Sequence, residues 1–468
     1  MINQTLLNLR TVWQNLNILK SDRLKVQADL SVSDVETMRA HMRVCLDGKG
    51  GDVSARAHAA KLGEAYLGLS DIGRLRFLRI LAEDFGVDTQ RVYCFASAIL
   101  SEDSAQSLAD LHQKMRKALR PSALELLTKF NSIPSGVKFL VDMRADLLRL
   151  ADKTDPKING LNKSNELNEL NELDQNLKGL LRSWFDVGFL DLVRMSWSTP
   201  AALLEKLIDY EAVHAIRSWS DLKNRLQADR RCFAFFHPRM PDEPIIFVQV
   251  ALVNSLSSNI QELLDESAPA INPYKANTAI FYSISNAQMG LTGVGFGDFL
   301  IKRVVADLKT ELPNITMFST LSPVPGLLKW LNQQDESELL SVKERQDLSG
   351  VEGFSSLAGV LAIPGWYMNT VLAEALRIPL MRLTAHYLVN LRRRHRALDP
   401  VANFHLNNGA RLERINWLAD ISIKGMQESA GIMVNYLYKL DEIEANHEAY
   451  RETAATIKSS MVASILKS

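Results

Sequence analysis

The stretch that decides the fold reads TAIFYSISNAQMGLTGVGFGDFL, Thr278 to Leu300. Its first part, Thr278 to Ile284, is rich in β-branched and aromatic residues and predicts a strand. A glycine-rich segment follows, and apolar residues then recur at helical spacing from Gly297 to Leu312. Another apolar run, Ile315 to Phe318, predicts a further strand. Strands that alternate with helices in this way indicate an α/β or α+β domain.

Two more apolar runs precede this stretch, CFAFF (Cys232 to Phe236) and PIIFVQVALV (Pro244 to Val253), and both predict strands. We therefore expect three strands, the glycine-rich loop, a helix and a further strand, in that order. The order resembles the core of the acetyl-CoA-dependent N-acetyltransferase superfamily, whose loop of similar composition holds the coenzyme A (CoA) pyrophosphate. This half is expected to be an α/β, acetyltransferase-like, CoA-binding catalytic domain.

The first half of the chain predicts only helices. One face of the run that ends at Gly86 carries apolar residues at helical spacing: Ile72, Leu75, Leu78, Leu81 and Phe85. From Met1 to about Asp155 no run alternates like a strand. We expect an all-α helical bundle over residues 1–190 and the catalytic domain over residues 191–468. The Asn-Glu-Leu repeat from Asn165 to Leu173 is of low complexity and predicts an exposed loop or a mobile helical connection.

Composition excludes several classes of protein. A chain of 468 residues is too long for one compact core. Lys plus Arg and Asp plus Glu both total 54, so no net charge attracts nucleic acid or an anionic membrane. The three cysteines show no CxxC spacing, which argues against a disulfide framework or a cysteine-rich zinc site. With no apolar signal peptide or membrane span in the sequence, we expect a cytoplasmic protein.

The glycine-rich loop has the composition of a phosphate-binding loop. Its glycines permit sharp turns that turn backbone amides outward, and the following helix adds the positive end of its dipole. The alternative is a flexible turn, since the loop lacks the Lys-Ser/Thr ending of a P-loop ATPase. The candidate CoA-binding residues are Gln288, Met289, Gly290, Leu291, Thr292, Gly293, Val294 and Gly295.

Three later motifs are more specific: FSTLSPVPGLLKWL from Phe318, DPVANFHLNNGARLERINWLADISIKG from Asp399, and NYLY from Asn435. With the loop before them, they resemble the malonyl-CoA decarboxylase family over roughly Arg230 to Leu440. The resemblance implies that malonyl-CoA is converted to acetyl-CoA and carbon dioxide. It also implies a helical N-terminal domain that serves self-association, as a dimer or tetramer, and no metal or organic cofactor beyond the CoA of the substrate.

The family's catalytic pair is a serine and a histidine. His405 matches the histidine of its Asn-Phe-His-Leu motif. Its Phe-Ser-x-Leu-Ser-Pro motif offers two serines here, Ser319 and Ser322. We favour Ser319, which directly follows the strand that ends at Phe318, and Ser322 remains the alternative. Both members of the pair are expected to contact the malonyl group.

The surroundings of His405 read as a loop, where catalytic residues concentrate. Asn403 and Tyr438 are candidate supporting residues, and Asn408 could also orient the histidine. Loss of the carboxylate leaves a thioester enolate, so the reaction needs an oriented thioester and one proton on the α-carbon.

Two questions stay open from the sequence. The basic cluster Arg392 to Arg396 is either a solvated helix end or a contact to the CoA ribose phosphate or to a neighbouring subunit. The alternative activity is CoA-dependent N-acyl transfer, which would require an acceptor amine site and a base. No motif assigns either of these, so decarboxylation is the preferred prediction.

Overall fold

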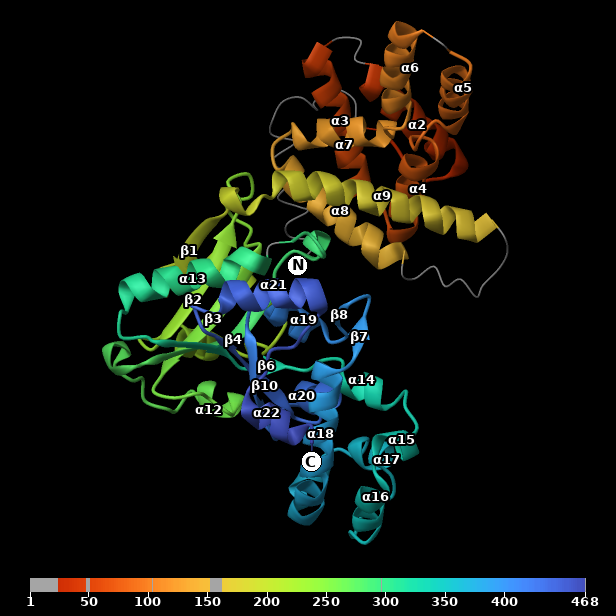
Figure 1. Cartoon of the computed structure of the whole chain (residues 1–468). Coiled ribbons are helices and arrows are strands. Elements are labelled where there is room, and N and C mark those ends of the chain that lie inside the picture. The colour runs from red at the N-terminus through yellow and green to blue at the C-terminus, as the bar shows by residue number, and fades with distance from the viewer. Residues whose placement is uncertain (1–23, 48–50, 103, 152–161, 296, 468) are drawn as a thin grey trace. The chain divides into compact units, whose positions relative to one another are not determined.

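The computed structural model describes residues 24–47, 51–102, 104–151, 162–295 and 297–467. By its internal contacts the chain divides into two compact units. The first unit comprises residues 1–190, 237–241 and 288–295, and the second comprises residues 191–236, 242–287 and 296–468. Helices build the first unit, and the second carries the main sheet (Figure 1). This confirms the predicted combination of a helical N-terminal region and an α/β C-terminal region.

Most helices of the first unit pack around an aromatic core. The helices of this unit are α2 (Val32–Asp47), α3 (Gly51–Leu67), α4 (Asp71–Glu83), α5 (Thr89–Leu100), α6 (Ala105–Ala118), α7 (Ser122–Asn131), α8 (Gly136–Ala151) and α9 (Asn162–Trp184). The ring of Tyr66 makes edge contacts with Phe77 and Phe139, at centroid distances of 5.0 and 5.6 Å. All three side chains are buried. Such contacts between large apolar groups supply most of the stability of a helical bundle.

The Asn-Glu-Leu repeat is helical, not a loop. It lies within α9, and Leu170, Leu173 and Leu177 are buried in the core of the first unit. Their spacing of three and four residues places them on one face of the helix. The prediction of an exposed loop is therefore wrong for residues 165–173. The repeat's own period matches the period of a helix, so low complexity here does not mean low order.

The second unit contains an 8-stranded sheet in the order β1-β2-β3-β4-β5-β10-β6, with β9 paired to β10. The strands are β1 (Asp191–Met195), β2 (Arg230–Phe236), β3 (Ile246–Val253), β4 (Thr278–Asn286), β5 (Met317–Thr320), β6 (Ser322–Pro323), β9 (Arg411–Asn416) and β10 (Met433–Tyr438). Only β4 and β5 pair in parallel; the other described pairs are antiparallel. The strands β2 and β3 are almost wholly buried, which explains their unbroken apolar sequences.

The expected order of elements is confirmed. The strands β2, β3 and β4 are followed by the glycine-rich loop, by α13 (Gly297–Glu311) and by β5. The parallel pairing of β4 and β5 requires a crossover connection, and α13 provides it. No helix within the described residues is long and apolar enough to span a bilayer.

The remaining helices belong to the second unit. Two lie between β1 and β2, one lies between β3 and β4, and the others follow β5. These helices are α10 (Ala201–Tyr210), α11 (Trp219–Arg225), α12 (Ile260–Leu263), α14 (Leu327–Leu331), α15 (Glu336–Leu339), α16 (Val342–Ser349), α17 (Leu357–Leu361), α18 (Thr370–Val389), α19 (Pro400–Asn407), α20 (Ile423–Ser429), α21 (Ile443–Thr453) and α22 (Ser460–Ile465). A separate hairpin, β7 (Arg392–Arg393) with β8 (Arg396–Ala397), follows α18.

Candidate active site

Ser322 and His405 lie in direct contact in the second unit. The Oγ atom of Ser322 is 3.0 Å from Nε2 of His405, although the residues are far apart in the sequence. Both side chains are buried, with exposed fractions of 6% and 3%. A hydroxyl and an imidazole at hydrogen-bond distance are the usual arrangement of a nucleophile or proton-transfer pair.

The other nitrogen of His405 also has a fixed partner. Its Nδ1 atom lies 2.8 Å from the hydroxyl of Tyr438. The Ser322 hydroxyl in turn donates to Oγ1 of Thr320 at 2.9 Å. If the imidazole carries its proton on Nε2, it donates to Ser322 and accepts from the Tyr438 hydroxyl, and Ser322 is left to donate to Thr320. The network therefore fixes the orientation of the imidazole ring.

The alternation of side chains along a strand explains how these groups meet. β10 pairs with β5 and then with β6, so Ser319 lies opposite Leu437 and Ser322 lies opposite Val434. Residues two apart on a strand share a face. Thr320 and Ser322 are two apart and hydrogen-bonded, and Tyr436 and Tyr438 are two apart and both contact His405.

Ser319, the serine favoured from the sequence, does not contact His405. It is fully buried, and its hydroxyl donates to the backbone oxygen of Tyr436 at 3.0 Å. Ser319 and Thr320 are consecutive residues of β5, so the Ser319 side chain belongs to the opposite face of the strand. The expectation rested on a strand that ends at Phe318, whereas β5 continues to Thr320. The geometry therefore favours the alternative, Ser322, as the hydroxyl partner of the histidine.

His405 lies on a helix, and the prediction of a loop at this position is wrong. The helix α19 begins at Pro400, directly after its N-cap Asp399, and ends at Asn407. Proline at the first helical position and aspartate before it are favourable helix-start residues, a signal present in the sequence.

The two asparagines near His405 hydrogen-bond to a backbone carbonyl and to a tyrosine of a neighbouring helix. The Oδ1 atom of Asn403 accepts a hydrogen bond from the Tyr450 hydroxyl at 2.9 Å. The Nδ2 atom of Asn408 donates to the backbone oxygen of Phe404 at 2.7 Å. Neither hydrogen bond involves the His405 side chain. Of these candidate supporting residues, only Tyr438 contacts the imidazole.

Burial dominates the electrostatics of the site. It lowers the pKa of His405 to about 3, because an imidazolium would lose its hydration there. Burial likewise holds the pKa of the Tyr438 hydroxyl well above its usual range. Both groups are therefore neutral at pH 7. The site is a neutral network of donors and acceptors with no charge of its own.

Tyr436 is a site residue that the sequence analysis did not single out. Its ring stacks on the imidazole of His405 with centroids 4.6 Å apart and an interplanar angle of 24°. Its backbone N–H donates to Oγ1 of Thr320 at 3.1 Å. A β-bulge between Asn435 and Tyr436 shifts the register at this point. The sequence pattern Tyr-x-Tyr places two aromatic residues on one face of a strand, so it could have indicated both tyrosines.

The glycine-rich loop belongs to the first unit, where it packs on α8 and α9. A Cβ atom at Gly290 would lie 1.8 Å from the backbone oxygen of Val141, so this glycine is required for close packing. Gly293 has a φ of +74°, and a Cβ atom there would lie 2.9 Å from Nζ of Lys178. At Gly295 a Cβ atom would meet nothing within 4 Å.

Part of the loop's backbone is already engaged. The N–H groups of Leu291, Thr292 and Val294 donate to carbonyls of the loop itself. The expectation that the loop turns its amides outward is therefore wrong for these three residues. Gly293 and Gly295 are exposed, and their N–H groups have no hydrogen bond to another described residue.

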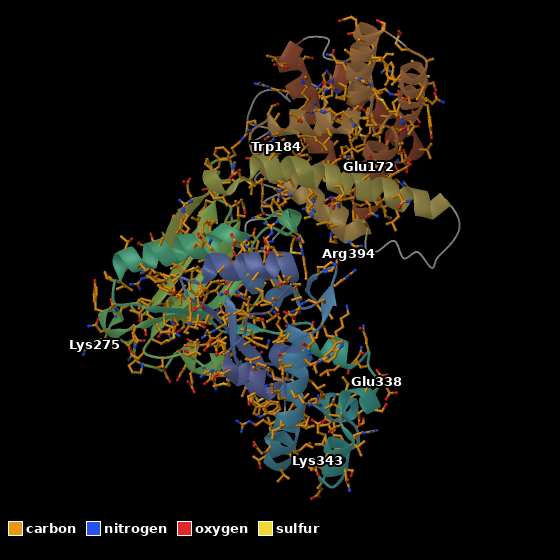
Figure 2. The ribbon with its side chains drawn as sticks, viewed as in Figure 1. Glu172, Trp184, Lys275, Glu338, Lys343 and Arg394 are labelled. Carbon is orange, nitrogen blue, oxygen red and sulfur yellow. The ribbon has the colours of Figure 1, made fainter. Side chains whose placement is uncertain are left out.

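The basic cluster forms a hairpin and not a helix end. α18 ends at Val389, and the strands β7 and β8 contain Arg392 and Arg396. Arg394 lies at the tip of the hairpin with a positive φ (Figure 2). Arg392 is engaged internally, donating to Oγ1 of Thr456 at 2.5 Å. In the described part of the chain, no group of three or more His, Cys, Asp or Glu side chains is placed to hold a metal ion.

Comparison with known proteins places the chain in a family. The family model described as the malonyl-CoA decarboxylase C-terminal domain matches residues 188–468, and the model of the N-terminal domain matches residues 85–185. The chain belongs to the malonyl-CoA decarboxylase family. The resemblance drawn from the motifs is thereby confirmed.

Curated relatives and solved structures agree with this placement. The chain is 40% identical to goose (Anser anser anser) "Malonyl-CoA decarboxylase, mitochondrial" over 418 residues, covering 85% of this chain and 81% of the goose protein. The mouse (Mus musculus) protein of the same name is also 40% identical, with 85% and 82% covered. A crystal structure of malonyl-CoA decarboxylase from Rhodopseudomonas palustris is 40% identical, with a TM-score of 0.82 over 93% of this chain and 99% of that one. The Agrobacterium vitis enzyme is 39% identical with a TM-score of 0.80, over 92% and 99%.

Proposed function

We propose that the protein decarboxylates malonyl-CoA to acetyl-CoA and carbon dioxide, and that Ser322 and His405 carry the reaction. Membership of the malonyl-CoA decarboxylase family supports the substrate and the reaction. The observation that supports the residues is the 3.0 Å contact between Ser322 Oγ and His405 Nε2. This assignment replaces Ser319, whose hydroxyl donates to a backbone carbonyl.

In the proposed reaction the bond between the α-carbon and the carboxylate carbon breaks. Its electron pair passes into the thioester enolate, and the carboxylate leaves as carbon dioxide. The Ser322 hydroxyl turns from Thr320 to the malonyl thioester and stabilises the developing negative charge on its oxygen. A buried, neutral surrounding favours this step, because it removes water from a carboxylate that must become an uncharged gas.

His405 then delivers one proton to the α-carbon. The carbon of a thioester enolate is a stronger base than the imidazolate that remains after transfer, so a neutral Nε2–H group can supply the proton. The hydroxyl of Tyr438, bonded to Nδ1, offsets the negative charge left on the ring. Water returns the proton to the imidazole. One proton is consumed for each carbon dioxide released.

The glycine-rich loop, residues 288–295, is proposed to bind the CoA phosphates with Lys178. The two exposed glycines, Gly293 and Gly295, offer N–H groups. The ammonium group of Lys178, on α9 of the same unit, lies beside Gly293. Backbone amides without an internal partner, with an ammonium group beside them, are a favourable arrangement for a phosphate. Gly290 is not part of this argument, because close packing alone explains it.

We also propose that the helical stretch 1–190 serves self-association and that the partner is a second copy of the chain. The helices α5 and α6 pack against each other, and neither contains a fully buried side chain. Tyr93 and Leu100 on α5 are 75% and 90% exposed. A pair of amphipathic helices with such exposed apolar residues favours a protein partner.

Two further expectations remain proposals. No metal or organic cofactor is proposed, since the thioester of the substrate itself accepts the electron pair; dialysis against a chelator should leave the turnover rate unchanged. A cytoplasmic location is proposed from the three free cysteines. The goose and mouse relatives are named mitochondrial, so cell fractionation is the deciding measurement.

The direct test is to incubate the purified protein with malonyl-CoA and detect acetyl-CoA and carbon dioxide by mass. Decarboxylation predicts equal amounts of both products whether or not amines are present. The alternative, N-acyl transfer, predicts a malonylated amine and free CoA, and no carbon dioxide. In deuterated water the proposed proton delivery should place one deuterium on the acetyl group of each product molecule.

A further inference from the structure

Asp399 is a deeply buried carboxylate whose partners are backbone amides and one hydroxyl. Its exposed fraction is 1%. One oxygen, Oδ1, accepts the N–H groups of Val401 and Ala402 at 3.0 and 2.9 Å. These bonds cap the first turn of α19, the short helix that carries His405. The direction in which His405 leaves the helix therefore depends on this cap.

The other oxygen of Asp399 reaches the segment that follows Ser322. Its Oδ2 atom accepts the N–H of Gly326, the N-cap of α14, at 3.4 Å. Gly326 is four positions after Ser322, on the turn that leaves β6. One carboxylate thus contacts both chain segments that supply the proposed catalytic pair.

Tyr387 completes this contact from a third element. Its hydroxyl, on α18, lies beside the Asp399 carboxylate and acts to lower the pKa of that carboxyl group. A Cβ atom at Gly326 would lie only 2.1 Å from this hydroxyl and 3.5 Å from Oδ2 of Asp399. The φ of Gly326 is −93°, so the absence of a side chain is explained by this close approach and not by the backbone angle.

We propose that Asp399 is a positioning residue for decarboxylation: it ties the start of α19 to the turn after Ser322 and so keeps Ser322 and His405 at hydrogen-bond distance. The inference rests on the proposed function, since the pair must perform the chemistry for its alignment to matter. Asp399 need not touch the substrate. Displacements of about 1 Å at a reacting group can cost about 10²-fold in rate, so a tie of this kind has catalytic consequences.

The ionised form of Asp399 is suited to hold both chain segments. Burial raises its pKa to about 6, while the bonds from Ala402, Gly326, Val401 and Tyr387 act in the opposite direction. The group is mostly ionised at pH 7 and has acceptor sites on both oxygens. Asparagine has nearly the same shape but only one acceptor oxygen. An asparagine at this position can accept the amides that cap α19 and lose the link to Gly326 and Tyr387. Alternatively, it can keep that link and lose the cap.

The first test is Asp399→Asn in the full-length protein. We expect kcat for malonyl-CoA to fall by about 10- to 100-fold, the cost of misaligned reacting groups, while KM changes by less than about threefold. The matched control is Asp335→Asn, an exposed N-cap aspartate of α15 whose carboxylate bonds only within its own turn, and its kcat should match wild type. An unchanged kcat for Asp399→Asn, or a rise in KM alone, contradicts the proposal.

The second test asks whether Asp399 acts through the pair. In a Ser322→Ala background the pair is already broken, so adding Asp399→Asn should lower the residual kcat by less than about twofold. A loss as large as in the wild-type background would mean that Asp399 acts independently of the pair, and the inference would be wrong. If Ser322→Ala itself keeps wild-type kcat, the proposed function of the pair fails instead, and the two failures are thereby distinguished.

A compensating pair of variants covers the case in which Asp399→Asn does not fold. Gly326→Ala places a Cβ atom against the Tyr387 hydroxyl and should displace the turn that follows Ser322, lowering kcat by about tenfold. Tyr387→Phe removes the clashing oxygen. The double variant should therefore have a higher kcat than Gly326→Ala alone. If the added Tyr387→Phe lowers kcat further, the contact does not position the pair.

Discussion

The Ser322–His405 centre and the glycine-rich loop use their polar groups in opposite ways. In the centre, buried side chains from four elements bond to one another, and no charge is present at pH 7. In the loop, several amides close the loop's own turns, and the groups left for a ligand are exposed beside Lys178. A bond-breaking step requires a fixed orientation, whereas phosphate binding tolerates an exposed, adaptable surface. Changes in the centre should therefore alter kcat, and changes in the loop should alter KM.

The largest effect is expected for His405→Ala. Loss of the proton donor should lower kcat by about 10²–10⁴, the usual contribution of a general acid, with little change in KM. Steady-state assays of acetyl-CoA formation measure both constants. His386→Ala, on α18, is a suitable control and should keep wild-type kcat. A folded His405→Ala protein with near wild-type kcat would remove the histidine from the mechanism.

Ser322→Ala should lower kcat by about 10²–10³, the effect of losing one donor to an oxyanion. Combined with His405→Ala, the loss should be smaller than the product of the two single losses, because the two groups serve one transition state. A double-variant cycle of kcat values tests this. Strictly multiplicative losses would indicate that the two side chains act separately.

In the loop, Gly295→Val should raise the KM for malonyl-CoA by about tenfold, with kcat unchanged, because a side chain would occupy the approach of the phosphate. Gly295 is the suitable position, because a Cβ atom there meets nothing in the protein. Lys178→Met should have a similar effect, about tenfold for a lost charge-assisted contact. Isothermal titration with CoA checks both changes, and wild-type affinity in both folded variants would exclude the loop as the phosphate site.

Leu100→Asp should change the assembly and leave kcat per chain unchanged. A buried charge at an apolar interface costs several kcal/mol unless it is paired, so the variant should form a smaller particle by light scattering. Val342→Asp, at a 74% exposed position on α16, is the matched control. The same particle mass for wild type and Leu100→Asp would show that α5 does not form the interface.

The smallest response is expected from pH. Because burial lowers the pKa of His405 to about 3, the imidazole stays neutral from pH 5 to pH 8. A neutral donor predicts no decrease in kcat as pH rises through the ordinary histidine pKa of about 6.5. An imidazolium donor with that ordinary pKa would lose about tenfold in kcat per pH unit above it. A pH profile of kcat at saturating malonyl-CoA separates the two cases.

The sequence was sufficient for the order of strands, and it singled out His405 as a candidate. The runs that became β2, β3, β4 and β5 are apolar because their strands are buried, and burial is what a sequence pattern reports. The Asn-Glu-Leu repeat was misread because low complexity was given more weight than its helical period.

The structure brings Ser322 to His405, whereas the sequence analysis favoured Ser319. The choice between the serines depended on where β5 ends, and strand ends are the least certain feature of a sequence reading. Because β5 continues to Thr320, Ser319 lies inside the strand and its side chain faces away from the side shared by Thr320 and Ser322. Asp399 was not singled out either, although an aspartate followed by a proline is typical of a helix N-cap. Its links to Gly326 and Tyr387 join distant segments and could be found only in three dimensions.

The measurement that tests the central claim most directly compares Ser322→Ala with Ser319→Ala. Both remove one hydroxyl, three positions apart, and acetyl-CoA formation at saturating malonyl-CoA is followed by mass for each. The Ser322 variant should be slower than wild type by about 10²–10³. The Ser319 variant loses only bonds to the backbone carbonyls of Thr320 and Tyr436 and should stay within about tenfold of wild type. If Ser319→Ala is the slower of the two, the pair identified by its contact with His405 is not the catalytic pair.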